Sequence, residues 1–233
     1  MKAVRLDALI FDLDGTLADS LADIGGAMNR LLATFGLPSQ PLDHYRQYVG
    51  EGAENLVRRT FLTATGRDWK TSDDVSAFPK PVAELTDAYR AQYAALEHEA
   101  SKPYPGIEAM LDGVVARRRR MAVLSNKRDD FTKHLVQHRF ARWPFVAVRG
   151  EQEGVPRKPA PTAALELALA LNVLPERIGF VGDTPIDVLT ARNAGMVPIA
   201  VTWGFRSRDE LSAAGAKHLL DRPDELLALL DGA

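Results

Sequence analysis

Cysteine is absent from the 233 residues of this chain, and its absence excludes several kinds of chemistry. Disulfides, thiolate zinc sites and cysteine nucleophiles all need a residue that the chain does not have. A chain without disulfides also suits a reducing compartment, and we expect the protein to be cytoplasmic.

Long apolar runs and an excess of one charge are missing as well. No uninterrupted apolar segment approaches the roughly 20 residues of a membrane span. Arg5 and Asp7 interrupt the apolar stretch that a signal peptide would need. The 29 basic and 31 acidic residues give a formal net charge of −2, which creates no strong field toward nucleic acid or an anionic membrane. We therefore expect neither as a partner.

Strand and helix patterns alternate after the KPYPG turn at residues 102–106. We expect strands at 121–124, 145–148, 178–181 and 198–202, and helices at 107–119, 129–139, 161–171 and 186–194. With a buried strand at 6–11, this order predicts an α/β fold. Its core would be Rossmann-like, with three layers, a parallel sheet and right-handed crossovers.

The segment between the first and second strands contains helical patterns and no convincing strand. Helices are expected at 42–48, 53–65 and 80–98, after a first helix that begins at Leu21 and ends before Gly36. We interpret residues 19–84 as an inserted all-helical cap. Residues 1–18 and 85–233 would form the catalytic core.

Two adjacent glycines, Gly25 and Gly26, lie inside the helical pattern that begins at Leu21. A glycine in a helix interior costs about 1 kcal/mol relative to alanine. Close packing is the one explanation that the sequence offers for this pair.

Polar residues follow the predicted strands where the strands end. They are Asp12 and Asp14, then Ser125, Asn126 and Lys127, then Lys158, and finally Gly182, Asp183 and Asp187. Sites in open α/β sheets form beyond the carboxyl ends of the strands, so these side chains should converge. Carboxylates can bind Mg²⁺ or act as nucleophiles, and a lysine supplies positive charge to a phosphoryl group. The set therefore indicates phosphoryl transfer.

Four motifs in this order resemble the haloacid dehalogenase superfamily. They are DLDGT at 12–16, a strand ending in Ser125, Lys158 before a helix, and GDTPID at 182–187. The helical insert resembles the C1 cap of that superfamily. The four motifs extend through nearly the whole chain, and their order is more specific than any one of them.

The resemblance implies four catalytic residues. Asp12 would be the nucleophile and Asp14 the general acid and base, while Ser125 and Lys158 would hold the phosphoryl group. A halide leaving group needs no proton, whereas an alkoxide does. Asp14 therefore points to a phosphate ester as the substrate.

The resemblance also implies a metal site and supporting residues. Mg²⁺ would be bound by Asp12, Asp183 and the backbone carbonyl of Asp14. The backbone N–H groups of Leu13 and Asn126 would contact phosphate oxygens. Supporting roles fall to three further residues: Gly15, Thr16 and Asp187.

Several longer stretches, among them VGEGAENLV at 49–57 and VGDTPIDVLTARNAG at 181–195, resemble phosphoglycolate phosphatases. This implies hydrolysis of 2-phosphoglycolate to glycolate and phosphate. The cap is expected to set substrate choice, with Gly50, Glu51 and Arg58 as substrate-binding candidates. The partner would be a small phosphorylated metabolite, and the chain would be a monomer or a homodimer.

Other functions remain open from the residues alone. A sugar phosphomutase of the β-phosphoglucomutase kind would use the same core with a sugar hydroxyl in place of water. A pyrophosphatase or nucleotide phosphatase is another option. Outside enzymes, a phospho-acceptor signalling domain also places aspartates, a hydroxyl and a lysine at sheet ends, but it needs neither a second aspartate like Asp14 nor a large insert.

Overall fold

The computed structural model describes residues 5–96 and 99–232. Two compact units are present. The core unit consists of Met1–Asp19 and Pro103–Ala233, and the helical unit of Ser20–Lys102. A two-stranded sheet, β2 (Ala18–Asp19) and β3 (Lys102–Pro103), lies where the chain passes between them.

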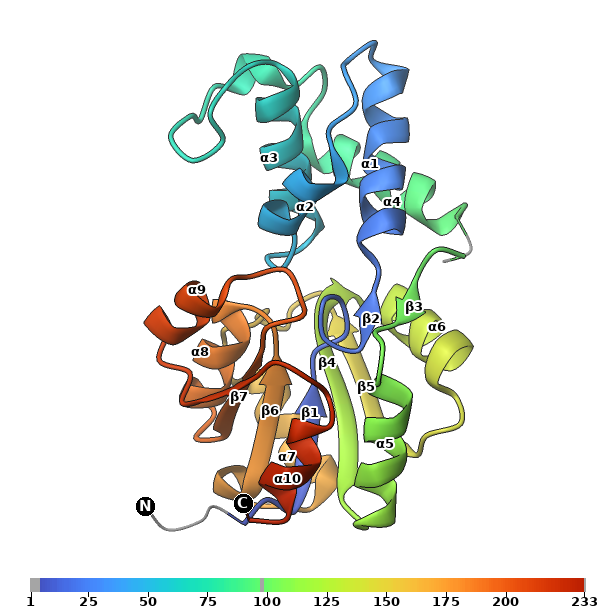
Figure 1. Cartoon of the computed structure of the whole chain (residues 1–233). Coiled ribbons are helices and arrows are strands. Elements are labelled where there is room, and N and C mark those ends of the chain that lie inside the picture. Colours follow the sequence, from blue (N-terminus) through green and yellow to red (C-terminus); the bar gives the residue numbers. More distant parts are fainter. Residues whose placement is uncertain (1–4, 97–98, 233) are drawn as a thin grey trace. The chain divides into compact units, whose positions relative to one another are not determined.

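A six-stranded sheet forms the centre of the core unit, in the order β5-β4-β1-β6-β7-β8 with every neighbouring pair parallel (Figure 1). Its strands are β1 (Ala8–Phe11), β4 (Arg120–Arg128), β5 (Phe145–Glu151), β6 (Ile178–Gly182), β7 (Val197–Val201) and β8 (His218–Leu220). The predicted parallel α/β core is confirmed.

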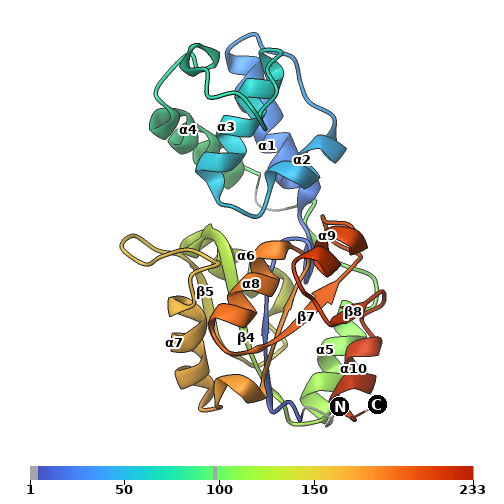
Figure 2. The same cartoon turned by 90° about the vertical axis from the view of Figure 1, so that its left-hand side faces the viewer.

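Helices cover both faces of this sheet, as Figure 2 shows. Leu9 and Phe11 of β1 pack with α5 (Ile107–Ala116), α6 (Asp129–Phe140) and α10 (Glu225–Leu230). Ala8 and Ile10 face the other side and pack with α7 (Thr162–Leu171) and α8 (Pro185–Asn193). Successive side chains of a strand point to opposite faces, so the short apolar run of β1 contributes to two separate cores.

Two departures from the expected elements are found, and the first of them changes the setting of site residues. β4 continues beyond the predicted end at 124 to Arg128, so Ser125, Asn126 and Lys127 lie within the strand. The C-terminal α9 (Arg208–Ala213), β8 and α10 were not predicted, because each has only three to six residues and shows too little periodicity.

The helical unit contains α1 (Leu21–Thr34), α2 (Leu42–Tyr48), α3 (Ala53–Ala64), a 3₁₀ turn at Val75–Ala77 and α4 (Val82–Ala94). Residues 97–98 of the expected fourth helix lie outside the described residues. The predicted boundary between 84 and 85 falls inside α4, and the unit instead ends at Lys102. The reason is that α4 packs against α1 and α3, which keeps it with the helices before it.

Gly25 is explained by the contact between α1 and α2. An ideal Cβ on Gly25 would lie 2.6 Å from Leu42 Cδ2 and 2.8 Å from a ring carbon of Tyr45. A Cβ on Gly26 would meet nothing within 4 Å. Close packing therefore accounts for the first glycine and not for the second.

Among the described residues, no helix is both long enough and apolar enough to cross a bilayer.

Substituting alanine at these two positions should have opposite effects. Gly25→Ala should lower the free energy of unfolding by about 1–3 kcal/mol, because its methyl group overlaps Tyr45. Gly26→Ala should raise it by about 0.5–1 kcal/mol, because it removes backbone freedom from the unfolded chain without a clash. Urea unfolding followed by circular dichroism measures both, and stabilisation by Gly25→Ala would contradict the packing explanation.

Candidate active site

The carboxyl ends of β1, β4 and β6 bring the predicted core residues together. Asp12 follows β1, Ser125 lies in β4, and Asp183 follows β6. Asp187 is in the first turn of α8, where it completes a capping box with Thr184. All four side chains are buried. Because parallel strands end at the same edge, residues separated by more than 160 positions in the sequence share one site.

Lys158 joins two of the carboxylates. Its Nζ lies 2.9 Å from Asp12 Oδ1 and 2.7 Å from Asp187 Oδ1. Burial lowers the pKa of Lys158, but attraction to Asp12 and Asp187 outweighs it and raises that pKa above its ordinary value. The lysine therefore remains a cation inside the site.

Asn126 fixes the backbone from which Lys158 projects. Its side-chain amide donates to the carbonyl of Lys158 at 3.1 Å, and its carbonyl oxygen accepts from the N–H of Lys158 at 3.0 Å. This pair of hydrogen bonds ties a loop residue to the interior strand β4. The sequence indicated only a backbone role for Asn126, so this contact of its side chain was missed.

Asp183 is the most buried of the acids, with 0% exposure. It accepts hydrogen bonds from Thr16 Oγ1 at 2.9 Å and from the N–H of Phe205 at 2.7 Å. Burial and the negative charge of Asp187 nevertheless raise its pKa to about 7. Burial also raises the pKa of Asp12 well above the ordinary range, despite the nearby Lys158.

Asp12, Asp183 and Asp187 form a group in which one carboxylate oxygen from each lies within 4.8 Å of the others. Three carboxylates are a donor set suited to a hard divalent cation. A cation there would also offset the repulsion that raises the pKa of Asp183. These residues therefore fit a metal site.

Gly15 makes room for this arrangement. Its φ is +86°, and an ideal Cβ there would lie 2.3 Å from Asp183 Oδ2. The sharp turn carries the chain from Asp14 to Thr16, whose hydroxyl then reaches Asp183. A side chain at this position would strain the backbone, and it would displace the carboxylate of Asp183 from the group that it forms with Asp12 and Asp187.

Asp14 is held by a residue to which the sequence assigned no role. Lys127 Nζ donates to both Asp14 oxygens, at 2.6 and 2.8 Å. Asp14 is not part of the carboxylate group, and its predicted metal contact through the backbone carbonyl stays a prediction. In a strand, Ser125 and Lys127 point to the same face and Asn126 to the other. The SNK stretch would therefore have indicated that Lys127 lies on the same face as Ser125, had the strand been expected to continue.

The remaining predicted residues are placed as follows. The N–H of Leu13 donates to Asp12 Oδ1 at 2.7 Å, and Ser125 Oγ accepts from the N–H of Lys127 at 3.2 Å. The predicted contacts of Leu13 and Ser125 with phosphate remain predictions.

The three substrate-binding candidates of the cap belong to the helical unit. Gly50 and Glu51 lie between α2 and α3, and Glu51 pairs with Arg59 at 2.5 Å. Arg58 lies on α3, where its exposed side chain pairs with Glu54 at 2.9 Å. Their role in recognising a substrate stays a prediction.

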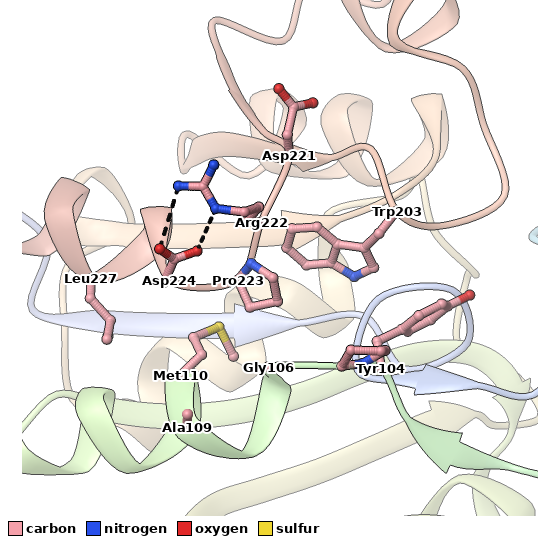
Figure 3. A pocket seen from close by; sticks show the side chains of 11 residues that line it. Tyr104, Gly106, Ala109, Met110, Trp203, Asp221, Arg222, Pro223, Asp224 and Leu227 are labelled. Carbon is pink, nitrogen blue, oxygen red and sulfur yellow. Dashed lines mark hydrogen bonds and ion pairs between the residues drawn. The ribbon is translucent and has the colours of Figure 1, made fainter.

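An apolar groove of about 520 Å³ lies elsewhere on the core unit. Tyr104, Met110, Trp203, Pro223 and Leu227 are among the residues that line it (Figure 3). None of the predicted catalytic residues lines this groove. Trp203 connects it to the site, since its indole N–H donates to the backbone carbonyl of Thr16 at 3.0 Å.

The parallel sheet, the strand-end aspartates and the buried lysine define a Rossmann-like protein whose site chemistry is based on carboxylates. The family model described as haloacid dehalogenase-like hydrolase matches residues 9–201, and the chain belongs to this family.

Similar proteins extend over nearly the whole chain. A phosphoglycolate phosphatase of Pseudomonas putida is 34% identical over 228 residues, covering 96% of this chain and 78% of its own. One from Vibrio parahaemolyticus is 31% identical, with 99% and 98% covered. A crystal structure from Lactobacillus delbrueckii subsp. bulgaricus, of a protein proposed to be a phosphoglycolate phosphatase, has a TM-score of 0.90 at 29% identity, with 99% of both chains covered.

The raised pKa of Asp183 predicts how stability depends on pH in the metal-free protein. Between about pH 4 and pH 7, the folded state keeps a proton on this carboxyl that the unfolded chain has lost. Stability should therefore fall as the pH rises through this interval. Thermal unfolding in the presence of a chelator, from pH 4.5 to pH 8, measures the decline.

Asp183→Asn serves as the control, because it removes one of the two carboxyl groups with a raised pKa and should make the decline shallower, with Asp12 accounting for what remains. Addition of MgCl₂ should stabilise the wild-type protein more at pH 8 than at pH 5, since protons compete with the metal for the carboxylates. A stability that rises across the interval, or an equal slope in the variant, would contradict the assignment.

Proposed function

We propose that this protein is a Mg²⁺-dependent phosphatase that hydrolyses 2-phosphoglycolate to glycolate and phosphate. The carrying observation is the buried Asp12, which lies beside the Lys158 cation and within the carboxylate group of Asp183 and Asp187. Family membership supports a hydrolase. The substrate is carried over from the names of the phosphatase relatives.

The reaction would proceed in two steps at Asp12. One carboxylate oxygen attacks the phosphorus, the bond to the ester oxygen breaks, and an aspartyl-phosphate forms. Asp14 gives a proton to the departing alkoxide, so that the alcohol leaves neutral. Asp14 then takes a proton from a water that attacks the phosphorus, which releases phosphate and restores Asp12.

Positive charge and N–H donors would hold the phosphoryl group during both steps. Lys158 contributes its ammonium, Ser125 its hydroxyl, and Leu13 and Asn126 their backbone N–H groups. Mg²⁺, bound through Asp12, Asp183 and the Asp14 carbonyl with Asp187 in support, would supply charge that offsets repulsion between carboxylate and phosphate.

The proposal includes predictions about the substrate-binding residues of the cap, the partner, the cellular location and the oligomeric state. Gly50, Glu51 and Arg58 stay candidates for contact with the part of the substrate that carries no phosphate. The partner is a small phosphorylated metabolite. The cytoplasmic location and the monomeric or homodimeric state also stay predictions.

Phosphate release with Mg²⁺ across a substrate panel tests the proposal. The panel contains 2-phosphoglycolate, glucose phosphates, nucleoside monophosphates, pyrophosphate and p-nitrophenyl phosphate. We expect 2-phosphoglycolate to be preferred, and Asp12→Asn and chelator each to abolish release. Release that survives Asp12→Asn would exclude the mechanism, and isomerised sugar phosphate without free phosphate would indicate a mutase instead.

Asp14→Asn should reduce turnover of 2-phosphoglycolate by about 10²–10⁴-fold, the usual value of general acid–base catalysis. Asparagine preserves the shape of the side chain and cannot deliver the proton. Steady-state kinetics at saturating substrate measures the loss. Near-normal turnover in this variant would remove Asp14 from the mechanism.

A further inference from the structure

The ion pair between Lys127 and Asp14 is almost entirely enclosed. The Lys127 side chain is 8% exposed and the Asp14 side chain 10%. Surface lysines usually keep the charged end in water, so enclosure of the ammonium against the Asp14 carboxylate requires a well-defined geometry. Both oxygens of Asp14 accept from the same nitrogen, at 2.6 and 2.8 Å.

The sheet register explains how two residues 113 positions apart meet. Phe11 of β1 stands opposite Val123 of β4 in a parallel pair, so the residues after β1 run beside the continuation of β4. Asp14 lies in the turn that follows β1 and Asp12, and Lys127 lies near the end of β4. Asp14 is therefore anchored through β1 and Lys127 through β4, and these two strands are adjacent in the sheet.

A two-point contact restricts how the Asp14 carboxyl group can rotate. In the proposed reaction this group must face the ester oxygen of the substrate, and proton transfer is sensitive to such orientation. Lys158 makes a similar ion pair with the proposed nucleophile Asp12, and it also contacts Asp187. The two lysines thus hold the two carboxylates that the reaction uses.

We propose that Lys127 is a positioning residue that orients the Asp14 carboxyl group toward the leaving oxygen. The inference rests on the proposed phosphatase function. Lys127 acts through Asp14 and leaves the formation of the bond between Asp12 and phosphorus unaffected. Its importance should therefore depend on how much the leaving group needs a proton.

A comparison of two substrates with different leaving groups tests this. The alkoxide from 2-phosphoglycolate needs a proton, whereas p-nitrophenolate leaves readily without one. Lys127→Met keeps the length of the side chain and removes the charge. We expect kcat/KM for 2-phosphoglycolate to fall by about 10²-fold, the cost of a misplaced catalytic group, and that for p-nitrophenyl phosphate to change little. The comparison uses kcat/KM because this ratio reports only the steps up to and including departure of the leaving group.

A double-variant comparison shows whether Lys127 works through Asp14. Asp14→Asn should show the same selectivity for the alkyl ester, and adding Lys127→Met to it should cause no further loss. Lys127→Arg keeps a cation and should restore part of the alkyl-ester activity.

Lys133→Met is the matched control. Lys133 on α6 also pairs with an aspartate, Asp129, but its side chain is 55% exposed. This variant should leave both activities unchanged. Lys127→Gln provides a second variant if Lys127→Met does not fold, as judged by circular dichroism.

An equal loss on both esters in Lys127→Met, no loss at all, or additive losses in the double variant would overturn the inference. Failure of the proposed function would look different, because the wild-type protein itself would then not release phosphate from 2-phosphoglycolate.

Discussion

Repulsion among buried carboxylates is the constraint around which this site is built. Asp12, Asp183 and Asp187 would each be ionised in water at neutral pH, and burial together makes their charges costly. Lys158 supplies one compensating cation, and hydrogen bonds from Thr16 and Phe205 stabilise Asp183. Burial and the charge of Asp187 still raise the pKa of Asp183. The same crowding of carboxylates makes the group suited to a divalent cation.

The compensating groups come from elements far apart in the sequence. β1, β4 and β6 are adjacent in the sheet, and each contributes one part of the site at its carboxyl end. The turn at Gly15 and the capping box of α8 then orient these parts over a few residues. Stability of the sheet and geometry of the site are consequently properties of the same strands.

The sequence predicted the parts of the molecule that repeat a pattern or form a motif. The parallel core, the cap helices α2 and α3, and the convergence of Asp12, Asp183 and Lys158 followed from periodicity and strand-end position. The pairing of Lys127 with Asp14 could not be predicted, because β4 continues past its apolar stretch into polar residues. The need for glycine at position 25 likewise becomes clear only from the packing of α2 against α1.

The two hydrogen bonds between Asn126 and the backbone of Lys158 have a consequence for the loop that precedes the lysine. Asn126 in β4 holds both backbone polar groups of Lys158, so the segment between β5 and Lys158 does not have to position the lysine by its own conformation. Loops beside reactive groups often have to hold a reactive side chain in position, and this segment does not. We therefore expect this segment to accept an inserted peptide while the lysine stays in place.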